Sequence, residues 1–145
     1  HMPLMQALTK SKDEQLAAIA GKSVKEATYH LRASSEWMIR FGDGTEESHR
    51  RAQEALDNLW TYTGDLFVMD EVHQQLLKAG IAPDLTTMKA AFDATVDKVL
   101  AEATLKRPTD GFMATGGRQG KHSEHLGFIL AEMQYLQRAY PGAEW

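Results

Sequence analysis

Apolar residues recur at helical spacing along most of this chain, and the first such run constrains the fold most. Its apolar positions follow the three- and four-residue steps of one α-helical face: Leu16, Ile19, Ala20, Val24, Ala27, Leu31, Met38 and Phe41. The run follows the capping-box pattern Ser11-Lys12-Asp13-Glu14 and stops at Gly42-Asp43-Gly44, a turn and C-cap signal. At roughly 1.5 Å per residue this predicts a helix of about 45 Å. A helix of that length is typical of a helical bundle.

The remaining sequence predicts further helices separated by short turns. Thr45 caps a second helix, whose apolar stripe continues to Leu66. A short helix runs from Asp70 to Gly80, another begins at Pro83-Asp84, and the last covers about His122 to Tyr140. Its inward-facing residues are predicted to be Leu126, Ile129, Leu130, Met133 and Leu136. No stretch predicts a strand, so the expected fold class is all-α.

Composition limits what such a fold could do. The chain has 145 residues, 43% of them hydrophobic, which suits one globular domain. A net charge of −4 argues against general binding to nucleic acids or anionic membranes. Because there is no cysteine, disulfides and thiolate chemistry are excluded, which fits a cytosolic protein. His1-Met2 has the character of a cloning scar, so we expect a single helical domain over residues 3–145.

His30 is the best-placed candidate metal ligand, in the middle of the long first helix. Di-iron four-helix bundles use Glu-x-x-His pairs, in which the two ligands three residues apart face one metal. Three residues before His30 stands Ala27, which has no donor atom, while Glu26 lies four residues before it. We therefore expect no metal ligand here and no catalytic residue in the chain.

Three other acid and histidine patterns resemble metal ligands only by spacing. Glu46-x-x-His49 and Asp70-x-x-His73 fall in the first turns of predicted helices, where acids stabilise the helix dipole anyway. A solvated helix start is the favoured interpretation of both. His122 and His125 form the densest cluster, but two ligands make a poor metal site, so packing or a partner contact is favoured.

A glycine-rich segment precedes the last predicted helix: Gly116-Gly117-Arg118-Gln119-Gly120-Lys121. Free backbone N–H groups, a helix N-terminus and two cations could hold a phosphate or a partner's carboxylate. No predicted strand precedes the segment, so it is not a P-loop. Candidate anion or partner contacts are Gly116, Gly117, Arg118, Lys121, His122 and His125. A flexible entry to the helix explains the same residues equally well.

Three stretches together resemble one known family, the structural, non-catalytic subunit of the bacterial phenylacetyl-CoA epoxidase (monooxygenase) complex. They are 25–32 (KEATYHLR), 42–51 (GDGTEESHRR) and 115–142, which contains HSEHLG and AEMQYLQRAYPG. The likeness covers essentially the whole chain after the first two residues. Family members are longer at the N-terminus, so the resemblance is to their C-terminal portion.

The resemblance implies a ferritin-like bundle in a cytoplasmic, multicomponent enzyme that epoxidises the ring of phenylacetyl-CoA during phenylacetate degradation. It implies a related catalytic subunit that holds the di-iron centre and pairs with this one, which has no cofactor of its own. Ala27 fits that implication, because the catalytic subunit would need a glutamate there.

Two other interpretations remain open from the sequence. In one, the chain is a divergent di-iron oxygenase subunit using Glu26, His30, Glu46 and His49 together with ligands from the missing N-terminal segment. In the other, Arg118 and Lys121 bind CoA phosphates or an acidic partner. We also expect self-association, because a partial bundle would expose an apolar face of its first helix.

Overall fold

The computed structural model describes residues 1–144, which form only α- and 3-10 helices joined by turns and loops. This confirms the predicted all-α class. Contacts between residues divide the chain into two compact units, His1–Ala114 and Thr115–Trp145, and each unit is described separately below. No helix within residues 1–144 is long and apolar enough to cross a membrane.

The first unit begins with a helix that the sequence pattern did not predict, α1 (Met2–Leu8). The long α2 (Glu14–Gly42) follows and ends where predicted. Its cap is Asp13, whose carboxylate accepts a hydrogen bond from the Leu16 N–H at 2.9 Å. The prediction that Ser11 opens a capping box is wrong, because the Ser11 hydroxyl instead donates to the Ile81 carbonyl, 70 residues away, at 2.7 Å.

The second predicted helix, α3 (Glu46–Trp60), starts at its predicted cap but ends earlier than its apolar stripe. Thr45 and Ser48 form a complete capping box at its start. At its end the Thr61 carbonyl accepts the Ala114 N–H at 2.9 Å, so it is not available to continue the helix. The 3-10 turn η1 (Gly64–Phe67) follows instead.

The next helices agree with the predicted start and stop signals. Asp70 caps α4 (Glu71–Ala79), which ends at the left-handed Gly80 with φ of 75°. Asp84 caps the 3-10 helix η2 (Leu85–Met88), which continues into α5 (Lys89–Glu102). The end of α4 is joined to the α1–α2 turn, where the Lys12 N–H donates to the Gly80 carbonyl at 3.0 Å.

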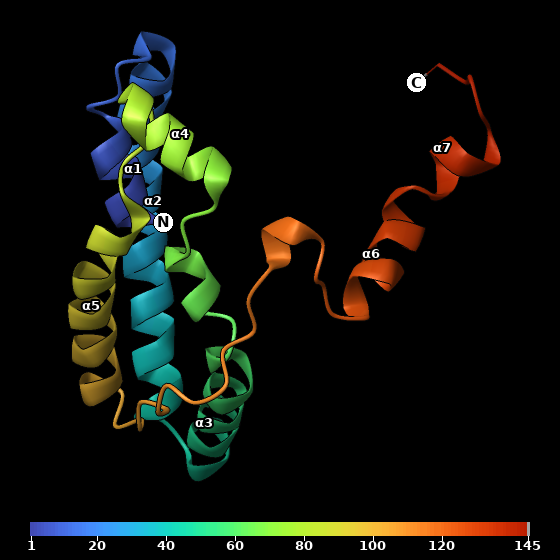
Figure 1. Cartoon of the computed structure of the whole chain (residues 1–145). Helices are drawn as coiled ribbons and strands as arrows, with labels where there is room; N and C mark the ends of the chain where they lie inside the picture. Colours follow the sequence, from blue (N-terminus) through green and yellow to red (C-terminus); the bar gives the residue numbers. More distant parts are fainter. Residues whose placement is uncertain (145) are drawn as a thin grey trace. The chain divides into compact units, whose positions relative to one another are not determined.

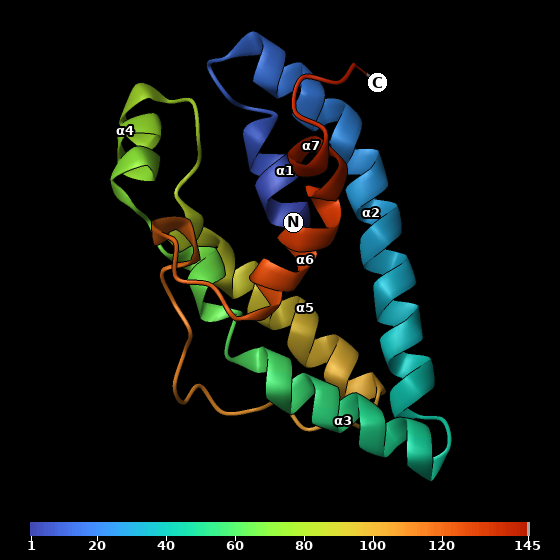
Figure 2. The ribbon, with the colours of Figure 1, turned by 90° about the vertical axis from the view of Figure 1, so that its right-hand side faces the viewer.

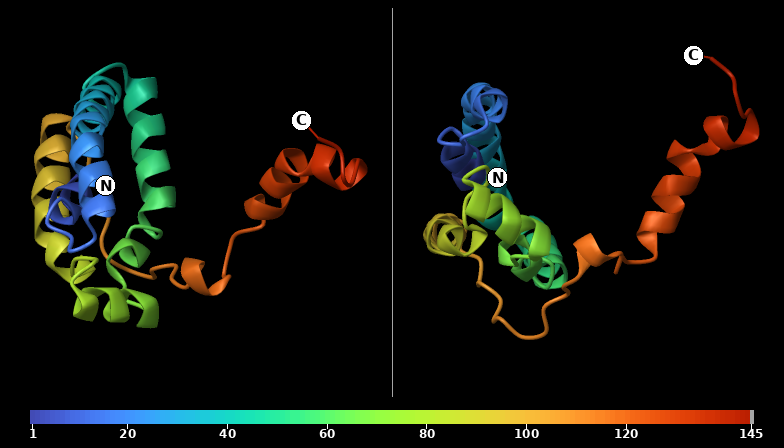
Figure 3. Two further views of the ribbon diagram at one scale, coloured as in Figure 1. Left: turned by 90° about the horizontal axis from the view of Figure 1, so that it is seen from above. Right: turned by 45° about the horizontal axis from the view of Figure 1, so that its top comes forward.

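In this unit α2 is the central element (Figure 1). It contacts α1 near its start and both α3 and α5 further along. The view from above shows α3 on one side of α2 and α5 on the other (Figure 3, left), and the side view shows both reaching the later half of α2 (Figure 2). Leu100, Ala103 and Leu105 form a buried cluster where α5 ends, against Met38, Ile39, Ala52, Leu56 and Val96.

The second unit contains the 3-10 turn η3 (Gly117–Gln119), α6 (His125–Met133) and α7 (Tyr135–Ala139). The predicted single helix from about His122 to Tyr140 is therefore wrong at its start, and it is interrupted at Gln134, where φ is −103° and ψ is 3°. The prediction of an inward face is also wrong for four of its five residues, which are exposed: Ile129, Leu130, Met133 and Leu136. In its described part, this unit has no second long helix against which that face could pack.

Candidate functional site

The predicted ligand positions on α2 differ in their exposure to solvent. Ala27 is buried, with 5% of its surface exposed, whereas Glu26 and His30 are both exposed. The His30 ring packs edge-on against the Tyr29 ring, with 5.9 Å between centroids. A metal site in the interior at this level would need a donor from the buried side of α2, where residue 27 supplies a methyl group.

The four ligands of the rival di-iron interpretation are not brought together. His30 lies 12 residues before Gly42, about 18 Å along the helix at its usual rise, whereas Glu46 and His49 stand at the start of α3. Within residues 1–144 no group of three or more histidine, aspartate or glutamate side chains is placed to hold a metal ion. The residues present in this chain do not fit a di-iron centre by themselves.

His49 has a structural contact that the sequence did not predict. The favoured interpretation, a solvated helix start, holds for the exposed Glu46 but is wrong for His49, which is half-buried. Its Nδ1 lies 2.7 Å from the carbonyl oxygen of Gly42, which also accepts a hydrogen bond from Thr104 Oγ1 at 3.3 Å. Since a carbonyl can only accept, Nδ1 carries a proton here. His49 therefore holds the α2–α3 turn closed.

His73 is likewise part of a helix start. Asp70 Oδ1 accepts the backbone N–H of His73 at 2.8 Å and lies 2.6 Å from its ring Nδ1. Both interactions belong to the cap of α4, so the predicted helix start is correct, but Asp70 and His73 are half-buried rather than solvated.

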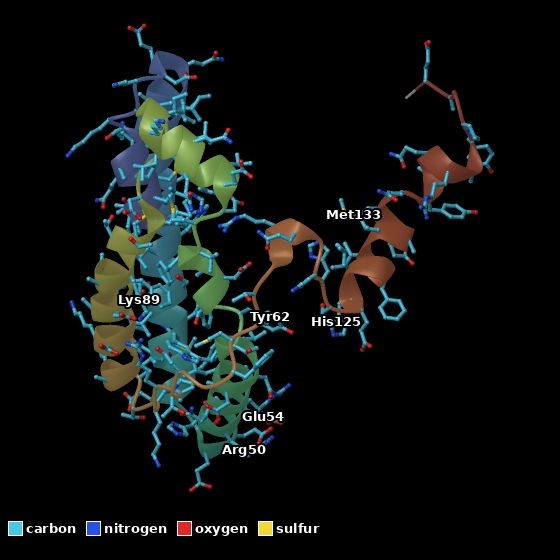
Figure 4. All side chains as sticks on the ribbon, in the orientation of Figure 1. Arg50, Glu54, Tyr62, Lys89, His125 and Met133 are labelled. Atoms are coloured by element: carbon cyan, nitrogen blue, oxygen red, sulfur yellow. The ribbon has the colours of Figure 1, made fainter. Side chains whose placement is uncertain are left out.

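The glycine-rich segment forms a closed turn. The Gln119 and Lys121 N–H groups both donate to the Gly116 carbonyl, at 2.9 and 3.0 Å, and the Gly120 N–H donates to the Gly117 carbonyl. These three N–H groups are therefore not available to an anion. The helix N-terminus expected beside them is also absent, since α6 begins at His125 rather than at His122 (Figure 4). Anion binding by Arg118 and Lys121 stays a prediction without the backbone support that first suggested it.

A network of ion pairs and ring contacts around Arg107 was not predicted from the sequence. Arg107 pairs with Asp93 and Asp97 of α5, both at 2.6 Å, and its guanidinium lies over the Trp60 ring, 4.9 Å from the centroid. The Trp60 indole N–H donates to Asp110 at 3.0 Å. The partners lie 10 to 50 residues apart in sequence, so no local spacing could have indicated the network.

Arg107 and its neighbours change the acidity of Asp93. Hydrogen bonds from Lys89 and then Arg107 hold the pKa of the Asp93 carboxyl below its ordinary value of 3.8. The two aspartates in turn raise the pKa of Arg107. This network fixes the loop that carries Arg107 and Asp110 to α3 and α5.

Two comparisons with known proteins, one with a family profile and one with a single relative, agree with each other. A profile of the family described as Phenylacetic acid catabolic protein matches residues 1–145. The chain is 48% identical over all its 145 residues to a protein of Escherichia coli (strain K12) that is named as the C subunit of 1,2-phenylacetyl-CoA epoxidase. It spans 58% of the length of that relative.

Proposed function

Because the chain belongs to the phenylacetic acid catabolic protein family, we propose that it acts as a structural subunit of a multi-subunit phenylacetyl-CoA epoxidase. The name of the E. coli relative supports this proposal, since it describes one subunit of such an enzyme. The family description supports a role in phenylacetate degradation. We propose that the enzyme works in the cytoplasm.

The buried Ala27 carries the proposal that the subunit is non-catalytic. A di-iron site needs carboxylates and imidazoles that converge from neighbouring helices. At the position where α2 would contribute a carboxylate, this chain has a methyl group in the interior, and Glu26 and His30 are exposed. No reaction step is assigned to residues of this chain.

The partner we propose is a catalytic subunit of the same family, which holds the di-iron centre and reacts with oxygen and the aromatic ring. This chain would supply a helical frame that supports the partner in its active form. The wide exposure of large apolar side chains on α2, such as Trp37 and Tyr29, is consistent with contacts to another protein.

Reconstitution tests the proposal. The 145-residue chain is mixed with the catalytic subunit of the same enzyme, and complex formation and epoxidation of phenylacetyl-CoA are measured. The E. coli relative serves as a positive control. We expect a stable complex and a rise in activity that saturates at a fixed ratio of the two chains.

A Glu26→Gln/His30→Ala double variant separates the structural role from a catalytic one. Both side chains are exposed, so the variant should fold, and the proposal predicts unchanged activity of the complex. Loss of activity in a complex that still assembles would instead support the di-iron interpretation.

A further inference from the structure

The loop that follows α5 contains an aspartate–glycine pair, Asp110-Gly111. The chain has one other such pair, Asp43-Gly44, in the turn between α2 and α3. In such a pair the backbone nitrogen of the glycine can attack the side-chain carboxyl carbon of the aspartate, because the glycine has no side chain to obstruct the approach. Both pairs share this local chemistry, so any large difference between them must come from the surrounding fold.

The pair Asp43-Gly44 is held between two helix ends. Asp43 is the C-cap of α2, and Thr45, directly after the pair, caps α3. A Cβ placed on Gly44 would lie 2.6 Å from the Arg40 carbonyl oxygen and 2.7 Å from Ser48 Oγ. Close-packed atoms leave this backbone little room to rotate, and ring formation between the two residues requires such a rotation.

The pair Asp110-Gly111 lies outside any helix. Among the described residues, apart from the chain neighbours of Gly111, no atom lies within 4 Å of a Cβ placed there. The Gly111 N–H donates to the Thr109 carbonyl at 2.9 Å, which closes a γ-turn around Asp110. That turn can open without disturbing a helix. Both pairs are exposed to solvent, so the freedom of the backbone is what distinguishes them.

We propose that Asp110-Gly111 is a site of spontaneous isoaspartate formation in the folded chain. The Gly111 nitrogen bonds to the side-chain carboxyl carbon of Asp110, and the amide proton leaves with the carboxyl hydroxyl as water, which forms a succinimide ring. One water then adds to the ring. Where it breaks the bond between the Gly111 nitrogen and the main-chain carbonyl carbon of Asp110, the chain afterwards runs through the former side-chain carboxyl. No oxidant or cofactor is needed, and the mass of the chain is unchanged.

The rearrangement removes a contact that fixes the loop to α3. Asp110 Oδ1 accepts the indole N–H of Trp60 at 3.0 Å, and Trp60 is 5% exposed. In isoaspartate the free carboxylate is attached directly to Cα, and the main chain is one carbon longer. The carboxylate then no longer reaches the Trp60 N–H in the same geometry, which leaves a buried donor without its acceptor. The inference goes beyond the proposed function and does not depend on it.

Timed incubation of the folded 145-residue chain at physiological temperature tests the proposal. Trypsin releases the two pairs on separate peptides, 41–50 and 107–118, and mass spectrometry with backbone fragmentation distinguishes isoaspartate from aspartate in each. We expect isoaspartate at Asp110 to accumulate at least about 5-fold faster than at Asp43, because an irregular loop opens more readily than a junction of two helices.

The matched control is the same chain unfolded in urea. Both pairs should react there at rates within about two-fold of each other, because the fold that separates them is gone. Gly111→Ala is a second control. Its methyl group enters open space, so the variant should fold, and isoaspartate at Asp110 should form at least about 10-fold more slowly because the methyl group obstructs the attack.

Thermal unfolding of the isomerised chains, separated by chromatography, tests the consequence for the loop. They should unfold at a lower temperature than unmodified chains from the same incubation, because Trp60 has lost its partner. Equal rates at the two pairs in the folded chain would overturn the proposal, and so would a difference that persists in urea. An unchanged unfolding temperature would overturn the proposed release of the loop from Trp60.

Discussion

The carbonyl oxygen of Gly42 accepts hydrogen bonds from two side chains, His49 Nδ1 and Thr104 Oγ1. It thus joins the end of α2, the start of α3 and the segment after α5. A Cβ on Gly42 would lie against the Ala103 carbonyl oxygen and 2.8 Å from the Ala103 Cβ. Thr104 keeps a left-handed backbone, with φ of 57°, to reach this position. At residue scale, the absence of a side chain on Gly42 permits the end of α2 to pack against the backbone of Ala103.

Gly42→Ala tests this contact. We expect the free energy of unfolding to fall by about 1–3 kcal/mol, because the methyl group meets backbone atoms that cannot move aside easily. Gly21→Ala is the matched control, since nothing lies within 4 Å of a Cβ there and Gly21 is in the interior of the same helix. The free energy of unfolding of the control, measured by urea unfolding, should rise by about 0.5–1 kcal/mol. Equal effects of the two substitutions would contradict the proposed contact.

His49→Ala separates the two roles considered for this histidine. Loss of its hydrogen bond to Gly42 leaves a half-buried carbonyl with one donor fewer, so unfolding should become easier by about 1 kcal/mol. The iron content of the assembled enzyme should not change. A lower iron content with unchanged stability would show that His49 is a ligand.

At the scale of elements, the loop 103–114 is fixed to α3 and α5 by side chains. Gln53 accepts the Lys106 N–H at 2.8 Å and donates to the Lys106 carbonyl at 2.9 Å. Arg107 and Asp110 add their contacts to Asp93, Asp97 and Trp60. These contacts make an irregular segment a defined part of the first unit.

Arg107→Met should lower the stability of the unit by about 1–2 kcal/mol, through loss of partly exposed ion pairs and the contact with the Trp60 ring. Arg50→Met is the matched control. Arg50 pairs with Glu47 and Glu54 on the exposed side of α3 (Figure 4), and its loss should cost less than about 0.5 kcal/mol.

The Arg107 contribution should depend on pH. Because the folded-state pKa of Asp93 is lowered, its stabilisation is fully present above the ordinary value of 3.8. It is lost as the pH falls through the lower folded-state value. The stability difference between Arg107→Met and the parent chain should therefore shrink in strong acid to the part that the contact with the Trp60 ring contributes. A difference that persists unchanged there would contradict the ion-pair explanation.

The sequence predicted correctly the helix ends that depend on a capping side chain or a glycine at the end itself. Gly42, Thr45, Asp70, Gly80 and Asp84 all end or cap helices as predicted. The errors occur where distant residues compete for a backbone group. Ser11 bonds to Ile81 rather than capping α2, and the Thr61 carbonyl bonds to Ala114 rather than extending α3.

Of the candidate site, the sequence could predict the features that follow from which residue stands at a position. It could not predict those that require contacts between distant segments. That residue 27 is an alanine and not a carboxylate is visible in the sequence, and the structure buries this residue. The Arg107 network requires tertiary contacts, so no pattern within one helix indicates it.

At the scale of the whole molecule, the chain belongs to the phenylacetic acid catabolic protein family and spans 58% of the E. coli relative's length. Its proposed role is that of a helical subunit paired with a partner that holds the di-iron site, since residues 1–144 bring together no cluster of metal-binding side chains.

The most direct measurement is the iron content of each separated chain, by mass spectrometry, after co-purification of this chain with its catalytic partner. We expect the iron to remain with the catalytic partner, and this chain to retain none above background. Stoichiometric iron on this chain, lost on substitution of His30 by alanine, would contradict the proposed non-catalytic role.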